Sequence, residues 1–119
     1  MPDSYTGQHF FAEVDMLNDQ LEESVDEMRL AGRDMAQAER DYRVALAKKI
    51  WELRAAGVPV TIINDLARGD EEVAMLKLKR DAAETDWKTC IEVVNVTKLK
   101  VRTIAEQIGR EWGRPSNVQ

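Results

Sequence analysis

Two stretches with a seven-residue apolar repeat constrain the fold more than any other feature of this chain. Between residues 7 and 56, and again between residues 70 and 112, apolar side chains recur at alternating spacings of three and four. Such a repeat predicts helices that pack along their length, as in a coiled coil. The first stripe comprises Phe10, Val14, Leu17, Leu21, Met28, Ala31, Met35, Ala38, Tyr42 and Ala45. The second comprises Val73, Leu76, Ala83, Trp87, Cys90, Val94, Val101, Ile104 and Ile108, with interruptions at Arg80 and Thr97.

The segment between the stripes, GVPVTIINDLARGDEE at residues 57–72, is predicted to be a corner. Gly57 is expected to end the first helix, and Pro59 to hold the chain extended. A short helix over about 61–67 follows, with Thr61 as its N-cap, and Asp70 caps the last helix. Gly69 is expected to permit the turn. Three apolar residues of the short helix, Ile62, Ile63 and Leu66, are expected to plug the open end of the helix pair.

The last helix is expected to end near residue 112, because Gly113 and Pro115 are typical stop signals. Residues 1–6 and 114–119 are predicted to be flexible tails of a single helical-hairpin domain, 1–119. The stretch VTKLKVRTI at 96–104 alternates as a strand does. We predict helix there, since no second strand is available to pair with it.

The predicted fold is therefore all-α: two long antiparallel helices, about 7–56 and 70–112, joined by the short helix. A reversal centred near residue 63 would place residue 24 near residue 102. The acidic stretch 1–27, with eight Asp or Glu and no Lys or Arg, would then meet the basic stretch 95–119, unless both are solvated faces. Two helices leave apolar width uncovered, so we predict a homodimer that forms a four-helix bundle. A higher oligomer or a heterologous partner are the alternatives.

Composition argues against most chemistry. The net charge is −5, and the chain has one cysteine, Cys90, and one histidine, His9. We predict no catalytic residues, no metal site and no cofactor. A metal-dependent nucleotide hydrolase of the all-α kind is the second alternative, because Glu23 with Asp26, and Asp81 with Glu84, are acidic pairs at helical spacing. The predicted register keeps these two pairs apart within one chain.

A nucleic-acid-associated factor is the first alternative. ELRAAGVPVTIINDLARG resembles the start of a helix-turn-helix segment, but Ala67 and Arg68 intervene before the turn glycine, and three acids open the following helix. Those acids would face phosphates. The candidate contacts near the corner are Lys48, Lys49, Arg68, Lys77, Lys79 and Arg80.

The central block, residues 41–84, resembles small all-helical proteins encoded by phages and prophages of Gram-positive bacteria. Its matching features are Tyr42-Arg43 before an Ala-Leu helix, the Gly-x-Pro corner, the run DLARG at 65–69, and Lys79-Arg80-Asp81. The resemblance implies a context and no activity.

The function expected from these observations is that of a non-enzymatic, oligomeric interaction protein. The N-terminus has no basic and apolar leader, and no apolar run is long enough to span a bilayer, so we expect a cytoplasmic protein, in the host cell if it is phage-encoded. The candidate partner-binding residues are those with the most varied side chains at the corner: Asn64, Asp65, Arg68 and Asp70.

Overall fold

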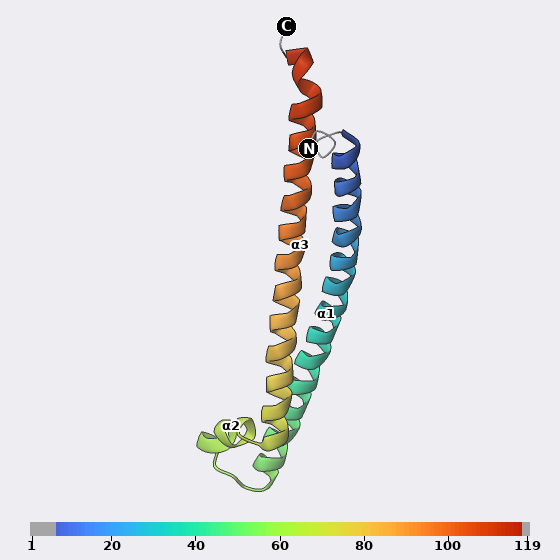
Figure 1. Cartoon of the computed structure of the whole chain (residues 1–119). Helices are drawn as coiled ribbons and strands as arrows, with labels where there is room; N and C mark the ends of the chain where they lie inside the picture. Colours follow the sequence, from blue (N-terminus) through green and yellow to red (C-terminus); the bar gives the residue numbers. More distant parts are fainter. Residues whose placement is uncertain (1–6, 118–119) are drawn as a thin grey trace. The chain divides into compact units, whose positions relative to one another are not determined.

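The computed structural model describes the backbone of residues 7–117 and the side chains of residues 8–111. Three helices form the described chain: α1 (Gly7–Ala55), α2 (Val60–Arg68) and α3 (Glu71–Asn117) (Figure 1). The predicted all-α fold, with two long helices and a short one between them, is confirmed. The stretch 96–104 is helical throughout, and residues 7–117 contain no strand.

The predicted end of the last helix is wrong. α3 continues to Asn117, five residues beyond residue 112, so most of the predicted tail 114–119 is helical, while residues 1–6 and 118–119 lie outside the described residues. Pro115 lacks the N–H that would bond to the preceding turn, but near a helix end this removes a single hydrogen bond. Gly113 lowers helix propensity by about 1 kcal/mol without stopping the helix.

The chain divides into two compact units, and each contains a segment of α1 and a segment of α3. The first unit comprises residues 1–28 and 90–119. Its buried residues are Phe10, Leu17, Val94 and Thr97, of which the first three belong to the predicted stripes. Thr97 interrupts the predicted stripe but stays buried, because its hydroxyl donates a hydrogen bond to the Val93 carbonyl at 2.8 Å.

The second unit, residues 29–89, contains α2 and a pair of antiparallel helix segments in one constant register. Trp87 lies against Gly32, Arg80 bonds to Glu39, and Lys49 pairs with Asp70. From the first contact to the second, the residue number rises by seven on α1 and falls by seven on α3. From the second contact to the third, it rises by ten on α1 and falls by ten on α3. The two helix segments therefore keep one antiparallel register across the unit.

This register corrects the predicted one by seven residues. A reversal centred near residue 63 would have placed residue 39 opposite residue 87, whereas residue 39 meets Arg80. The centre of the reversal lies between Pro59 and Val60, because the chain turns at the end of α1 and α2 follows the turn instead of straddling it. A shift of one heptad leaves both stripes facing each other, so the apolar pattern alone did not distinguish the two registers.

The corner begins with a Schellman motif. Gly57 has a φ of 80°, which glycine adopts without strain. The amide of Gly57 donates to the Arg54 carbonyl at 3.1 Å, and that of Val58 donates to the Leu53 carbonyl at 3.1 Å. The predicted end of the first helix at Gly57, and the extended conformation of Pro59, are thus confirmed.

The start of α2 differs from the prediction. Pro59 is its N-cap, no side chain caps it, and Thr61 lies inside the helix, so Thr61 is not a capping residue. The Pro59 carbonyl accepts the first helical hydrogen bond, from the Ile62 amide at 3.1 Å, and the proline ring fixes φ at the helix entry. Gly69 has a φ of −83°, so the turn into α3 needs no glycine-specific conformation.

Candidate interaction surface

The four residues predicted to bind a partner do not form one group. Asn64, Asp65 and Arg68 are exposed and lie within one turn of each other on α2. Asp70 instead caps α3: its Oδ2 accepts a hydrogen bond from the Val73 amide at 3.2 Å, and its Oδ1 lies 3.3 Å from Lys49 Nζ. Three exposed polar side chains therefore remain as partner candidates, with Asp70 stabilising the corner beneath them.

The bonds of the Asp70 carboxylate affect its titration. The hydrogen bond from the Val73 amide, followed by the contact with Lys49, holds the pKa of Asp70 below its ordinary value, although partial burial acts in the opposite direction. The same pair raises the pKa of Lys49 above its ordinary value, chiefly through the hydrogen bond with Asp70. Both groups stay charged at neutral pH, so the corner is held by an ion pair.

Of the three residues of α2 predicted to be buried, the prediction is confirmed for Ile63 and wrong for Ile62 and Leu66. Ile63 is 4% exposed and Ala67 is 0% exposed, whereas Ile62 and Leu66 are 45% and 47% exposed. Ile63 and Ala67 lie one turn apart and so share a face, while Ile62 and Leu66 lie one position before them and face outward. Val60 is also exposed, at 72%, but it lies about 160° around the helix from Ile62, on the other flank of the buried face.

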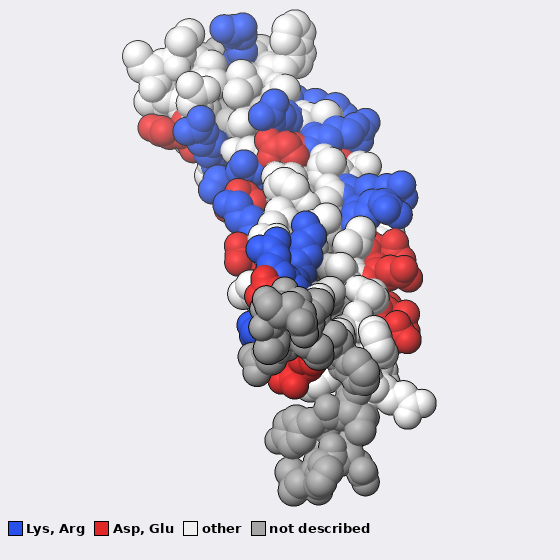
Figure 2. All heavy atoms as spheres, turned by 90° about the horizontal axis from the view of Figure 1, so that it is seen from above, with Lys and Arg blue, Asp and Glu red and all other residues white. Residues whose placement is uncertain are grey.

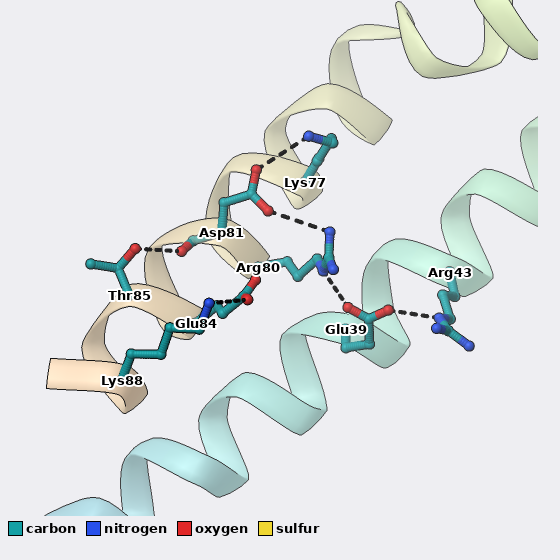
Figure 3. Close-up of polar contacts among 8 residues, drawn as sticks. All are labelled: Glu39, Arg43, Lys77, Arg80, Asp81, Glu84, Thr85 and Lys88. Atoms are coloured by element: carbon teal, nitrogen blue, oxygen red, sulfur yellow. Dashed lines mark hydrogen bonds and ion pairs between the residues drawn. The ribbon is translucent and has the colours of Figure 1, made fainter. Parts of the chain in front are cut away.

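Three of the six predicted nucleic-acid contacts are engaged with carboxylates of the same unit. Lys49 pairs with Asp70, Lys77 lies 3.2 Å from Asp81, and Arg80 bonds to Glu39 (Figure 3). Lys48 and Lys79 line a groove described below, and Arg68 lies on α2. Figure 2 shows both acidic and basic side chains on the face in view. The carboxylates beside Lys49, Lys77 and Arg80 reduce the attraction of these three cations for phosphates.

Glu39 is the centre of the polar contacts between α1 and α3 in this unit (Figure 3). Its Oε1 accepts a hydrogen bond from Arg43 Nε at 2.7 Å, and its Oε2 accepts one from Arg80 Nε. The bonds from Arg43 and Arg80 hold the pKa of Glu39 below its ordinary value, against the effect of partial burial. Arg80 also contacts Asp81 at 3.4 Å and lies over the ring of Tyr42, 5.9 Å from its centroid. Arg80, which interrupts the apolar stripe, therefore connects the two helices through an ion pair.

An open groove of about 1040 Å³ lies in the 29–89 unit between α1 and α3. Its apolar lining includes Val44, Ala45, Met75 and Leu76, and its charged lining carries both signs. The charged residues are Arg40, Asp41, Lys48, Lys49, Glu52, Asp70, Glu71, Glu72 and Lys79. A smaller adjoining hollow shares Asp41, Leu76 and Lys79, and extends the groove toward Asp34, Gln37, Ala38 and Ala83.

The sequence contained a signal for this groove that the prediction did not use. A second series with alternating spacings of four and three runs along α1: Leu30, Asp34, Gln37, Asp41, Val44, Lys48 and Trp51. Five of these seven residues line the groove or its extension. Because its charges interrupt the apolar residues, this series does not stand out as a packing face.

Within the described residues, no group of three or more His, Cys, Asp or Glu side chains is placed to hold a metal ion. The two acidic pairs of the hydrolase alternative fall in different units, Glu23 with Asp26 in the first and Asp81 with Glu84 in the second. No described helix has the length and apolarity needed to cross a membrane. Neither family models, nor curated proteins, nor solved structures give a match to this chain.

Proposed function

We propose that the protein is a non-enzymatic interaction protein that self-associates, first of all as a homodimer, and acts as an accessory adaptor of the phage or prophage type. The main observation behind the proposal is that the 29–89 unit exposes several large apolar side chains to solvent. Trp51 is 71% exposed, Leu78 63% and Met75 56%. Met75 lines the groove between α1 and α3, and Trp51 lines a shallow hollow that shares Lys48 and Glu52 with it.

The energetic reason is that each helix of the pair covers only one face of the other. Burying a large apolar side chain stabilises an association by about 1.5–3 kcal/mol. Exposed apolar groups that cluster and are rimmed by polar groups are typical of interaction surfaces. Several such side chains on one unit therefore favour association with a further helical surface.

The adaptor role is assigned to the exposed face of α2. Ile62 and Leu66 provide apolar contact on one flank of its buried face, and Asn64 and Arg68 provide polar contact on the other flank. α2 is connected to its unit by the Schellman turn at one end and by the Asp70 cap at the other. A partner would thus find this surface preformed, which lowers the entropy lost on binding.

The test of self-association is the mass of the full chain in solution. We expect light scattering coupled to size exclusion to give a dimer whose fraction rises with protein concentration. Met75→Lys places a charge in the groove and is expected to lower that fraction, whereas Ala36→Lys, on an exposed position of α1, is expected to leave it unchanged. A monomer at every concentration would contradict the self-association.

The adaptor role has a separate test. The full chain is used as bait for proteins of its source cell, beside an Ile62→Asp/Leu66→Asp variant that carries charge on the exposed apolar flank of α2. A partner retained by the wild type and lost by the variant supports the role. Because Asn64→Ala leaves the apolar groups in place, it shows whether polar contact also contributes. Equal retention by all three chains would refute the assignment to α2.

A further inference from the structure

The charge order along the groove face of α1 is self-complementary only in one orientation. Asp34 and Asp41 come first along the helix, and Lys48 follows one heptad after Asp41. All three line the groove or its extension. A parallel second copy would place Asp against Asp and Lys against Lys, whereas an antiparallel copy places Lys against Asp.

We propose that the groove of the 29–89 unit receives α1 of a second copy of this chain in antiparallel orientation, with a two-fold axis that crosses α1 between Asp41 and Val44. This inference rests on the proposed self-association and adds the occupant, the orientation and the register. In this register Lys48 of one copy lies opposite Gln37 of the other. Asp34 and Asp41 of that copy then stand one turn to either side of the ammonium group.

The apolar residues fit the same arrangement. Val44 lies beside the axis, opposite Asp41 of the second copy and about 4.5 Å along the helix axis from its own counterpart. Trp51, at one end of the series, comes within about a turn of Leu30, at the other end, in the second copy. Both are exposed in the single chain, at 71% and 57%. Met75 and Leu76 of α3 form the second wall of the groove, so the incoming helix contacts both helices of its partner, as in a four-helix bundle.

The mixed charge of the groove argues against a nucleic acid as its occupant. Its lining carries five carboxylates and four cations: Asp41, Glu52, Asp70, Glu71 and Glu72 alongside Arg40, Lys48, Lys49 and Lys79. These carboxylates would repel the phosphates of a nucleic acid. An interface formed by two identical surfaces needs both signs on each surface, and this groove has them.

The first test is charge reversal in the full chain. Lys48→Glu replaces the cation that faces Asp34 and Asp41 of the other copy with a third acid of that series. A symmetric dimer contains this change twice, so we expect dimerisation to weaken at least tenfold. Adding Asp34→Lys and Asp41→Lys to that variant reverses every pair and is expected to restore it. Lys88→Glu is the control: its Nζ contacts Glu84 on the other side of α3, and we expect no change. Circular dichroism verifies that each variant is helical.

The second test measures orientation with nitroxide labels on single cysteines in a Cys90→Ala background. Positions 47 and 54 are exposed on α1. About the proposed axis, the two copies of position 47 are separated along the helix by nine residue rises, about 14 Å, and those of position 54 by twenty-three, about 34 Å. A parallel pair would give no axial separation at either position. Electron paramagnetic resonance distances between copies distinguish the two.

The outcomes separate the two proposals. A dimer weakened by Lys48→Glu, restored by the triple change and labelled at unequal distances supports the groove model. A dimer that responds equally to Lys48→Glu and Lys88→Glu, or that gives equal label distances at both positions, overturns the groove model and leaves self-association standing. A wild-type chain that is monomeric at every concentration overturns both.

Discussion

Gly32 of α1 lies close to the indole of Trp87 on α3, and its replacement tests this close approach. A Cβ at position 32 would lie 3.2 Å from Trp87 Nε1 and 3.4 Å from Trp87 Cδ1. Glycine inside a helix costs about 1 kcal/mol relative to alanine. A methyl group there would therefore add helix propensity, but it would also push the indole ring by a few tenths of an ångström.

For Gly32→Ala we expect the two effects to cancel, leaving the free energy of unfolding within about 0.5 kcal/mol of the wild type. In a Trp87→Leu background the indole is absent, and the same substitution is expected to stabilise by the full propensity difference, about 1 kcal/mol. Gly32→Leu cannot be accommodated by a small ring shift and is expected to destabilise by about 1–3 kcal/mol.

Urea unfolding at one fixed protein concentration gives these values, since the stability of an associating protein depends on concentration. Ala36→Gly is the control, because residue 36 is exposed one turn along α1 and reports the propensity difference alone. If Gly32→Ala had the same effect with and without Trp87, the coupling energy of the double-mutant cycle would be zero. The close approach of the two helices at this point would then be refuted.

Three further predictions concern the corner and the Glu39 contacts. Ile63→Ala is expected to lower the free energy of unfolding by about 2–5 kcal/mol, and the neighbouring Ile62→Ala by well under half as much, because only Ile63 is buried; equal losses in urea unfolding would contradict the observed face of α2. Gly57→Ala is expected to cost about 1 kcal/mol, since it forces alanine into a φ of 80° without a steric clash, and an unchanged unfolding midpoint would exclude the left-handed turn. The pKa of Glu39 is below its ordinary value in the folded chain, so its ionised form stabilises the fold above a pH of about 4.3, and this contribution is lost as the pH falls through the folded pKa. Glu39→Gln should therefore unfold more easily at pH 7 and show a flatter loss of stability on acidification, and parallel pH curves for both proteins would contradict the role of the carboxylate.

The apolar repeat was sufficient to predict the helices, because a seven-residue pattern held over many turns has one stable solution. The helix ends were also predictable where a single residue determines them, as at Gly57 and Asp70. At α2 the prediction assigned burial to the three large residues Ile62, Ile63 and Leu66, and only Ile63 is buried. The structure buries Ala67 in place of a larger residue, because close approach of a short helix favours a small side chain. The nine-residue sequence of α2 alone does not indicate how closely the neighbouring helices approach it.

The predicted register was wrong for a different reason. Arg80 explains why the observed register is preferred to the predicted one. Sliding α3 by one heptad to the predicted position would keep apolar residues opposite each other, but it would place Arg80 opposite Leu46 and Trp87 opposite Glu39. A half-buried guanidinium would then face an aliphatic side chain, and Glu39 would lose one of its two arginine bonds. Separating this partly buried charge pair is unfavourable, whereas both registers keep the two apolar stripes opposite each other. The interruption of the stripe, which looked like a defect in the repeat, is the feature that distinguishes otherwise equivalent heptad alignments. The same reasoning applies to the groove face of α1, where Asp34, Asp41 and Lys48 break an apolar series and would select the orientation of a second copy.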